Sequence, residues 1–187
     1  MMFAKFQSQS IRVAQGSIAA GRRARGFTLI EILIVVVILG ILAAIVMPQM
    51  SGATTAAREN TLRDVTRYLR SQIVTYRAQH VDVSPGYPGG NTSVAPSATS
   101  FITQMTLYTD EGGNTSASAS SVYKFGPYLS KMPANPLSNL DTITIVSAGS
   151  SIPVPDGTTG WFYKPDTQEI VPNTVGNDSE GTAFIAY

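Results

Sequence analysis

The sequence predicts an α+β fold, in which one long N-terminal helix, half of it in a membrane, packs on a small antiparallel β-sheet. Three features of the 187 residues predict it. The segment 27–47 is apolar apart from one carboxylate, Glu31. The segment 49–80 follows it with apolar residues at steps of three and four, as on one face of a helix. The segment 160–173 holds two short apolar runs on either side of a turn, which is typical of a β-hairpin.

The composition excludes several kinds of site. The chain has no cysteine, so disulfides, thiolate nucleophiles and cysteine metal sites are excluded. Its one histidine, His80, excludes a multi-histidine metal site and leaves little room for histidine base catalysis. The first 26 residues hold five basic groups and no acid, which leaves eight basic against twelve acidic residues, a balance of −4, for 27–187. No nucleic-acid partner is expected with such a charge distribution.

The apolar segment 27–47 has the length of a membrane span. At 1.5 Å per residue, a helix of this length reaches about 31 Å, close to the thickness of the hydrocarbon layer. Pro48 ends the run, and arginines precede it at positions 22, 23 and 25. The positive-inside rule then places the N-terminus in the cytoplasm and the residues after 48 on the far side of the membrane. A buried core helix is the alternative, but apolar segments of this length are rare in small soluble domains.

Glu31 is the exception within the apolar segment. A lone carboxylate in lipid costs about 3 kcal/mol on insertion scales, and such groups are usually paired. No basic residue follows within helical reach, and Arg25 would extend toward the headgroups instead. A free α-amino group at Phe27, created by cleavage of the chain, would be a better-placed cation. Otherwise, Glu31 is an isolated charge that reaches the headgroup region.

The residues RGFTLIEILIVVVILGILAAIVMP, from 25 to 48, resemble the N-terminus of type IV pilins and of the pseudopilins of type II secretion systems. The resemblance implies that a membrane aspartyl peptidase, the prepilin peptidase, cuts between Gly26 and Phe27 and methylates the new N-terminal Phe27. Residues 1–26 would be a cleaved basic leader, longer than is usual in the family. A secretory signal is cut after its apolar stretch, whereas this cut precedes it, so the helix is kept. In a filament core, the N-terminal ammonium of one subunit would neutralise Glu31 of a neighbour and select the correct register.

Gly40 and Pro48 interrupt the transmembrane and assembly helix, 27–48. Glycine weakens a helix by about 1 kcal/mol relative to alanine, and proline removes one internal hydrogen bond. In the pilin-like interpretation, they allow a bend or local melting when a subunit leaves the bilayer. Alternatively, Gly40 only permits close helix packing and Pro48 only marks the membrane exit. The sequence leaves both interpretations open.

The segment 49–82 is predicted to continue as an amphipathic helix into the head. Its apolar stripe comprises Leu62, Val65, Leu69, Ile73 and Tyr76. Five arginines lie mainly off that stripe, at positions 58, 63, 67, 70 and 77. They are expected on a solvated face or against acidic neighbours in a filament, and Glu59 is expected to form an exposed pair with Arg63. His80 and Asp82 are expected at the helix end, where a histidine suits the carbonyl dipole.

Residues 83–187 are predicted to form a loop-rich globular head with an antiparallel sheet. Loops rich in Gly, Pro, Ser and Thr occupy 83–100 and 111–121. Between them, 101–108 fits either a short helix or a strand. The three prolines of the segment 122–139 force an extended, turning path, in which Tyr128 and Leu129 are expected to anchor to a core.

Strands are predicted toward the C-terminus. The alternating residues 142–146 predict one strand, and 160–173 predicts a hairpin with its turn at 164–167. From 122 to 173, the order GPYL…P.NPL…GWFY…T.EI..N resembles the head of the major pseudopilin of type II secretion. That resemblance implies a proline-rich loop before a small antiparallel sheet packed on the long helix.

Carboxylates in the head are candidate ligands for a calcium ion, which prefers hard oxygen donors. The candidates are Asp166, Asp178 and Glu180, with Asp156 or Glu169 as further donors. In the resembled pseudopilin family, a calcium ion stabilises this end of the head. Because no dense acidic cluster is present and the loop after the hairpin departs from the family's acidic spacing, solvated surface carboxylates are the favoured interpretation, and no cofactor is expected.

The expected function is assembly and not catalysis, because the sequence holds no GxSxG, P-loop or HExxH motif. The resemblance implies a pseudopilin that builds the pseudopilus of a type II secretion system for protein export. Expected partners are identical or related pilin-like subunits, the prepilin peptidase and an inner-membrane assembly platform. The subunit would wait in the bacterial inner membrane as a single-pass protein with its head in the periplasm, and would then join a periplasmic or extracellular fibre.

Two alternatives remain open at the level of sequence. One is a major or minor pilin of a type IV pilus, which would serve adhesion, motility or DNA uptake. The other is a monomeric single-pass protein whose membrane-anchored head binds a ligand or partner. Fibres on intact cells would favour the first, and a leader that stays on the mature protein would favour the second.

Overall fold

A computed structural model of the protein describes residues 26–187, without the side chains of 48–51. The predicted leader, 1–26, therefore lies outside the described residues except for Gly26. The chain divides after Ile45 into two compact units. The first unit contains the start of a long helix, and the second contains the rest of that helix and the head.

The described residues of the first unit, 26–45, are helical from Leu29 on and have no apolar core of their own. Helix α1 (Leu29–Gln79) begins in it and is long and apolar enough to cross a membrane. The large apolar side chains of the segment 27–47 are all exposed within the chain, from 47% for Val35 to 92% for Leu29. Because apolar surface of this extent is unfavourable in water, the segment requires lipid or the apolar surface of other chains around it.

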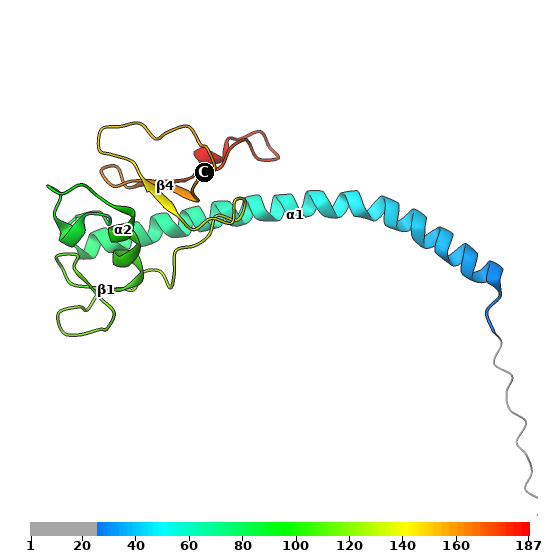
Figure 1. Ribbon diagram of the computed structural model, residues 1–187, viewed down its shortest axis with the longest axis horizontal. Helices are drawn as coiled ribbons and strands as arrows, with labels where there is room; N and C mark the ends of the chain where they lie inside the picture. The colour runs from blue at the N-terminus through cyan, green and yellow to red at the C-terminus, as the bar shows by residue number, and fades with distance from the viewer. Residues whose placement is uncertain (1–25) are drawn as a thin grey trace, which may run out of the picture. The chain divides into compact units, whose positions relative to one another are not determined.

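The second unit is built on the C-terminal half of α1 (Figure 1). The apolar stripe predicted there is confirmed by the burial of its side chains. Leu62, Leu69, Ile73 and Tyr76 are at most 1% exposed, and Val65 packs against the same core. The other fully or largely buried members of this core come from the head: Phe101, Met105, Tyr128, Leu129, Met132, Ile143, Trp161, Tyr163, Ile170 and Phe184. The helix thus forms one wall of the core of the head.

The segment 101–108 contains the end of a helix followed by the start of a strand. Helix α2 (Ala98–Thr106) begins after Ser97, whose side chain accepts a hydrogen bond from the Ser100 backbone N–H and so caps the helix. Strand β1 (Tyr108–Thr109) follows and pairs antiparallel with β2 (Thr115–Ser116). The short helix η1 (Pro88–Gly90) lies in the loop before α2.

Gln104 of α2 connects the two loops on either side of its helix. Its Nε2 donates to the carbonyl oxygens of Tyr87 at 2.8 Å and Gly113 at 2.9 Å, and its Oε1 accepts from the Gly86 N–H at 2.7 Å. The side chain is buried, so these three bonds supply partners that water would otherwise provide. The Gln104 side chain therefore holds in place two loops that have little apolar surface to pack against the core.

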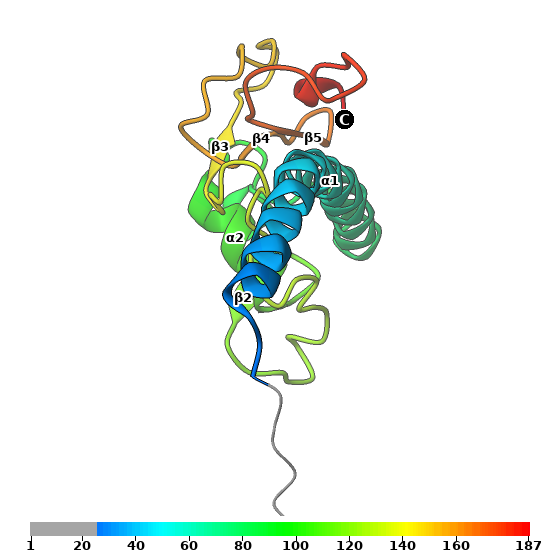
Figure 2. The same cartoon turned by 90° about the vertical axis from the view of Figure 1, so that its right-hand side faces the viewer.

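The main sheet contains the predicted hairpin and one parallel strand. Strands β4 (Trp161–Lys164) and β5 (Glu169–Pro172) pair antiparallel, as predicted, with Trp161 opposite Pro172. Strand β3 (Ile143–Ile145) pairs parallel to β4, so the sheet is mixed, whereas an antiparallel one was expected. A parallel neighbour requires a long crossover, and the connection from 146 to 160 provides it. The three-stranded sheet and the β1–β2 pair lie on different sides of the C-terminal half of α1 (Figures 1 and 2).

The proline-rich segment 122–139 anchors to the core as predicted. Tyr128 is 8% exposed and Leu129 is 1% exposed, and the N–H groups of both donate to the Met105 carbonyl oxygen at 3.0 and 2.8 Å. Asn135, fully buried, donates to the Gly160 carbonyl oxygen at 3.0 Å, next to β4. Hydrogen bonds thus hold a segment that belongs to neither sheet.

His80 follows the last residue of α1, as predicted for the helix end, and is buried. Its ring stacks on that of Tyr76, with centroids 3.7 Å apart. Nδ1 lies 2.6 Å from the Tyr76 carbonyl oxygen, and Nε2 lies 2.9 Å from Oγ1 of Thr109. Because a carbonyl oxygen only accepts, Nδ1 carries a proton. In the neutral ring, Nε2 then accepts from the Thr109 hydroxyl.

The stability of the head is expected to fall when His80 is forced to take a proton. Burial lowers the pKa of His80, and this outweighs the Tyr76 carbonyl and the negative charges of Asp110 and Glu111, which raise it. The stabilisation is therefore complete above the unfolded value of about 6.5 and is lost as the pH falls from there through the lower folded pKa. Urea unfolding of wild type and His80→Gln between pH 7.5 and 5 checks this. The wild type should lose more stability over this range, and equal losses would contradict the assignment.

Candidate functional site

The residues of the predicted cleavage site stand immediately before helix α1. Gly26 and Phe27 precede the helix, and Phe27 is 78% exposed. Thr28 is the residue before the first helical position. Its backbone N–H and its hydroxyl both donate to Oε2 of Glu31 at 2.8 Å, and the Glu31 N–H donates back to Oγ1 of Thr28 at 3.3 Å. These reciprocal bonds form a capping box.

The capping box gives Glu31 a partner within its own chain. The four residues Thr-Leu-Ile-Glu are themselves the S/T-x-x-E signature of this cap, a signal that an interpretation based on charge alone misses. A carboxylate in the first turn is also favoured by the helix dipole. The cap lies after the Gly26–Phe27 bond, so cleavage there would leave it intact. A neighbouring ammonium stays the predicted counter-ion of Glu31.

Helix α1 continues through both of the positions predicted to weaken it, Gly40 and Pro48. No atom of the described chain lies within 4 Å of a Cβ placed on Gly40, so the glycine faces open space in the single chain. The side chain of Pro48 lies outside the described residues. The roles of both residues in bending, melting or packing stay predictions.

The acidic candidates for a metal site are separated in the head. Asp166 accepts from the Gly149 N–H at 3.1 Å and lies 3.6 Å from Nζ of Lys164. Asp178 and Glu180 lie instead beside α1, around Arg63. Within residues 26–187, no group of three or more acidic or histidine side chains is arranged to hold a metal ion. The sequence candidates therefore do not converge on one site.

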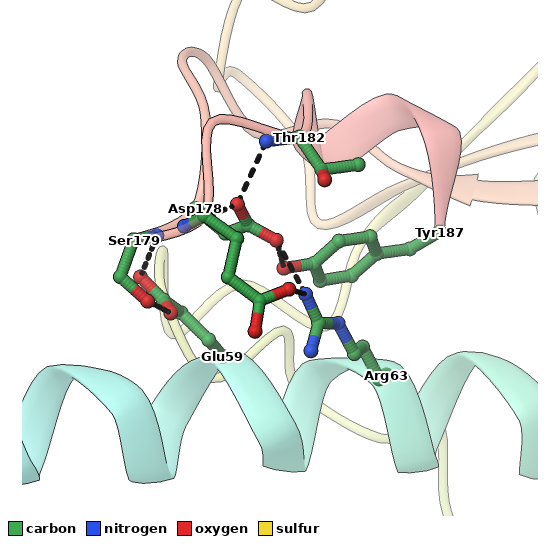
Figure 3. A network of polar contacts seen from close by, with 7 residues as sticks. Glu59, Arg63, Asp178, Ser179, Thr182 and Tyr187 are labelled. Carbon is green, nitrogen blue, oxygen red and sulfur yellow. Dashed lines mark hydrogen bonds and ion pairs between the residues drawn. The ribbon is translucent and has the colours of Figure 1, made fainter.

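The structure corrects the expectation of an exposed Glu59–Arg63 pair and a solvated Asp178. Glu59 is 5% exposed and accepts from the N–H of Ser179 at 3.1 Å and from its hydroxyl at 2.7 Å (Figure 3). Arg63 pairs with Asp178, whose side chain is fully buried. The cause is tertiary: the C-terminal residues fold back over this face of α1.

The arginines of α1 divide between this face and solvent. Arg70 donates to the backbone oxygens of Ile170, at 3.0 Å, and Tyr187. Arg77 pairs with Asp82 across 2.5 Å. Arg67 has a 75% exposed side chain beside the equally exposed Asp64, as predicted for a solvated face. Two of the off-stripe arginines, Arg63 and Arg70, therefore hold the C-terminal residues instead of lying on a solvated face.

The comparisons with known proteins concern the N-terminal part of the chain. Residues 21–47 match the prokaryotic N-terminal methylation motif. This match covers the Gly26–Phe27 bond and the capping box. The chain is pilin-like. The sequence resemblance of the N-terminal segment to pilins and pseudopilins is thereby confirmed. The structure separately confirms the long apolar N-terminal helix and the small sheets of an α+β head.

Three relatives of this pilin-like chain are similar to it over 30–42% of its length. The type II secretion system core protein G of Dickeya chrysanthemi is 44% identical over 57 residues, 30% of this chain and 37% of that protein. Its counterpart from Pectobacterium carotovorum subsp. carotovorum is 42% identical over 59 residues, 31% and 37% of the two chains. A fimbrial protein of Neisseria meningitidis serogroup B is 35% identical over 78 residues, 42% and 44% of the two chains.

The similarity thus spans less than half of the length of each of these relatives. No solved structure matches the chain. The pilin-type N-terminal segment is the part of the chain that the methylation motif matches.

Proposed function

We propose that this pilin-like protein is a structural subunit of a helical fibre and has no catalytic role. The observation that carries the proposal is the apolar segment 27–47, most of it the start of α1, whose large apolar side chains are all exposed within the chain. A cut between Gly26 and Phe27 precedes this segment, so the mature subunit keeps it. In a fibre, the segments of neighbouring subunits pack against one another and replace the lipid that covers them in the inner membrane. The arginines before the span favour a periplasmic head.

We infer further that the fibre is the pseudopilus of a type II secretion system. Two relatives named as secretion core proteins are 44% and 42% identical to the chain, against 35% for the fimbrial protein. The fimbrial relative supports the second candidate, a type IV pilin. Deletion of the gene separates the two: loss of export of secreted proteins supports the pseudopilus, whereas loss of surface fibres with export intact supports the pilus.

Processing is expected to remove residues 1–26 and nothing more. The intact mass of the native protein should correspond to a chain that begins at Phe27 and carries one added methyl group. A Gly26→Val variant should keep its leader and stay out of fibres, because a β-branched side chain then stands at the bond to be cut. A native chain that begins beyond Met47 would contradict the proposal, and one with an intact leader would support a monomeric anchored protein.

A further inference from the structure

The carboxylate of Asp178 is buried and fully occupied. Its Oδ1 accepts from the backbone N–H groups of Glu180 at 2.9 Å and Thr182 at 2.8 Å. Its Oδ2 accepts from the Tyr187 hydroxyl at 2.7 Å and from Nη2 of Arg63 (Figure 3). A carboxylate offers about four acceptor positions, so this one has none left for another ligand.

Arg63 reaches this carboxylate from helix α1. Its guanidinium lies over the ring of Tyr187, 4.6 Å from the centroid, and 3.4 Å from Oε2 of Glu180. Burial raises the pKa of Asp178, but the bonds from Tyr187, Thr182, Glu180 and Arg63 outweigh it and hold the pKa below its ordinary value. The carboxylate is therefore charged, and the positive charge beside it is the guanidinium, which keeps its proton in proteins.

A second residue of helix α1 also holds the C-terminal loop. Glu59, one turn before Arg63, accepts from the N–H and the hydroxyl of Ser179. Two residues of α1 thus hold adjacent residues of the C-terminal loop: the acidic Glu59 binds Ser179, and the basic Arg63 binds Asp178. Both contacts join residues more than one hundred positions apart in the chain.

These donors do not fit a calcium ion. Calcium takes about six to eight oxygen ligands, with several carboxylate or carbonyl oxygens free to face it. Here Oδ1 of Asp178 is already taken by two backbone N–H groups and Oδ2 by Arg63 and Tyr187. Glu180 has a 73% exposed side chain on the same guanidinium. Asp166 belongs to the hairpin turn and holds the Gly149 N–H. A metal ion at Asp178 would have to displace the Arg63 guanidinium.

We propose that Arg63 is the resident cation of the C-terminal loop, so that the head closes on helix α1 without a calcium ion. The positive charge that a metal would bring from solution is supplied by the chain and is present as soon as it folds. The stability of the head is then independent of the calcium concentration. If the chain is the fibre subunit proposed above, its fibres also form in calcium-poor medium.

Terbium luminescence tests the proposal on the full-length protein in detergent. Terbium occupies calcium sites, and an ion at Asp178 would lie beside the Tyr187 ring, which would sensitise its emission. We expect no saturable emission, and the same unfolding midpoint of Trp161 fluorescence in EGTA and in millimolar calcium. Saturable emission that Asp178→Asn removes, or a midpoint that calcium raises, would overturn the proposal.

A matched pair of variants tests the role of Arg63 itself. Arg63→Met removes the charge but keeps an unbranched side chain, and leaves Asp178 buried without a cation. Its unfolding midpoint is expected to fall by about 5 °C or more. Arg67→Met makes the same change one turn later at an exposed pair and should shift the midpoint by less than about 2 °C.

Equal shifts in the two variants would show that Arg63 is an ordinary surface arginine. A double variant, Arg63→Met with Asp178→Asn, should regain part of the lost midpoint, since no unpaired charge stays buried. If Arg63→Met does not fold, the terbium and calcium measurements on the wild type still decide the question.

Discussion

A Glu31→Leu variant is expected to be processed and inserted in the membrane but to form no detectable fibres. In the proposed fibre core, the N-terminal ammonium of one subunit faces Glu31 of its neighbour, and leucine would leave that ammonium in an apolar environment without a counter-ion. Removing one partner of a buried ion pair costs about 3–5 kcal/mol, which weakens the addition of each subunit by about a hundredfold to several thousandfold. Electron microscopy of sheared fibres and the mass of the membrane-bound chain measure the two outcomes.

The capping box requires a second variant, because leucine also removes the hydrogen bonds to Thr28. Glutamine is the other residue that completes a capping box, so Glu31→Gln keeps a bond to the Thr28 N–H and loses only the charge. If the charge drives assembly, Glu31→Gln fails as Glu31→Leu does. Normal fibres from Glu31→Gln, together with none from Glu31→Leu, would show that the cap matters and that the intersubunit ion pair does not.

The elements that local patterns specify could be predicted from the sequence. The length of the apolar segment 27–47 can be counted directly, and the stripe from Leu62 to Tyr76 repeats at the helical period. The hairpin 160–173 has a turn with proline and aspartate between its strands. The cap formed by Thr28 and Glu31 is equally local. It is visible in four consecutive residues, but it is overlooked when Glu31 is interpreted only by its charge.

The features that were predicted wrongly depend on residues far apart in the chain. Helical geometry places Arg63 off the apolar stripe, but nothing near it in the sequence indicates that Asp178 covers it, 115 positions later. Glu59 is likewise one turn from Arg63, yet it binds Ser179 instead. The parallel pairing of β3 depends on how the connection 146–160 crosses the sheet, and its residues carry no periodic pattern that would show it.

A Trp161→Ala variant is expected to lose most of the stability of the head while its membrane segment stays inserted. The side chain is fully buried in β4, and its Nε1 donates to the Pro133 carbonyl oxygen at 2.9 Å, so it joins the sheet to the proline-rich segment. Replacing a buried tryptophan by alanine costs about 3–5 kcal/mol. Domains have only about 5–15 kcal/mol in total, so the variant should be close to unfolding. Urea unfolding followed by the near-ultraviolet circular dichroism of the tyrosines measures the loss.

Val154→Ala is the matched control, because Val154 is 87% exposed and its truncation should change stability by less than about 0.5 kcal/mol. Protease digestion of membranes distinguishes the two regions of the chain: in Trp161→Ala the head should be degraded while a fragment containing the apolar helix is protected. The Glu31 variants should show the reverse, with a resistant head and no fibres. A Trp161→Ala head as resistant as that of Val154→Ala would mean that the core does not depend on the contact between β4 and the proline-rich segment.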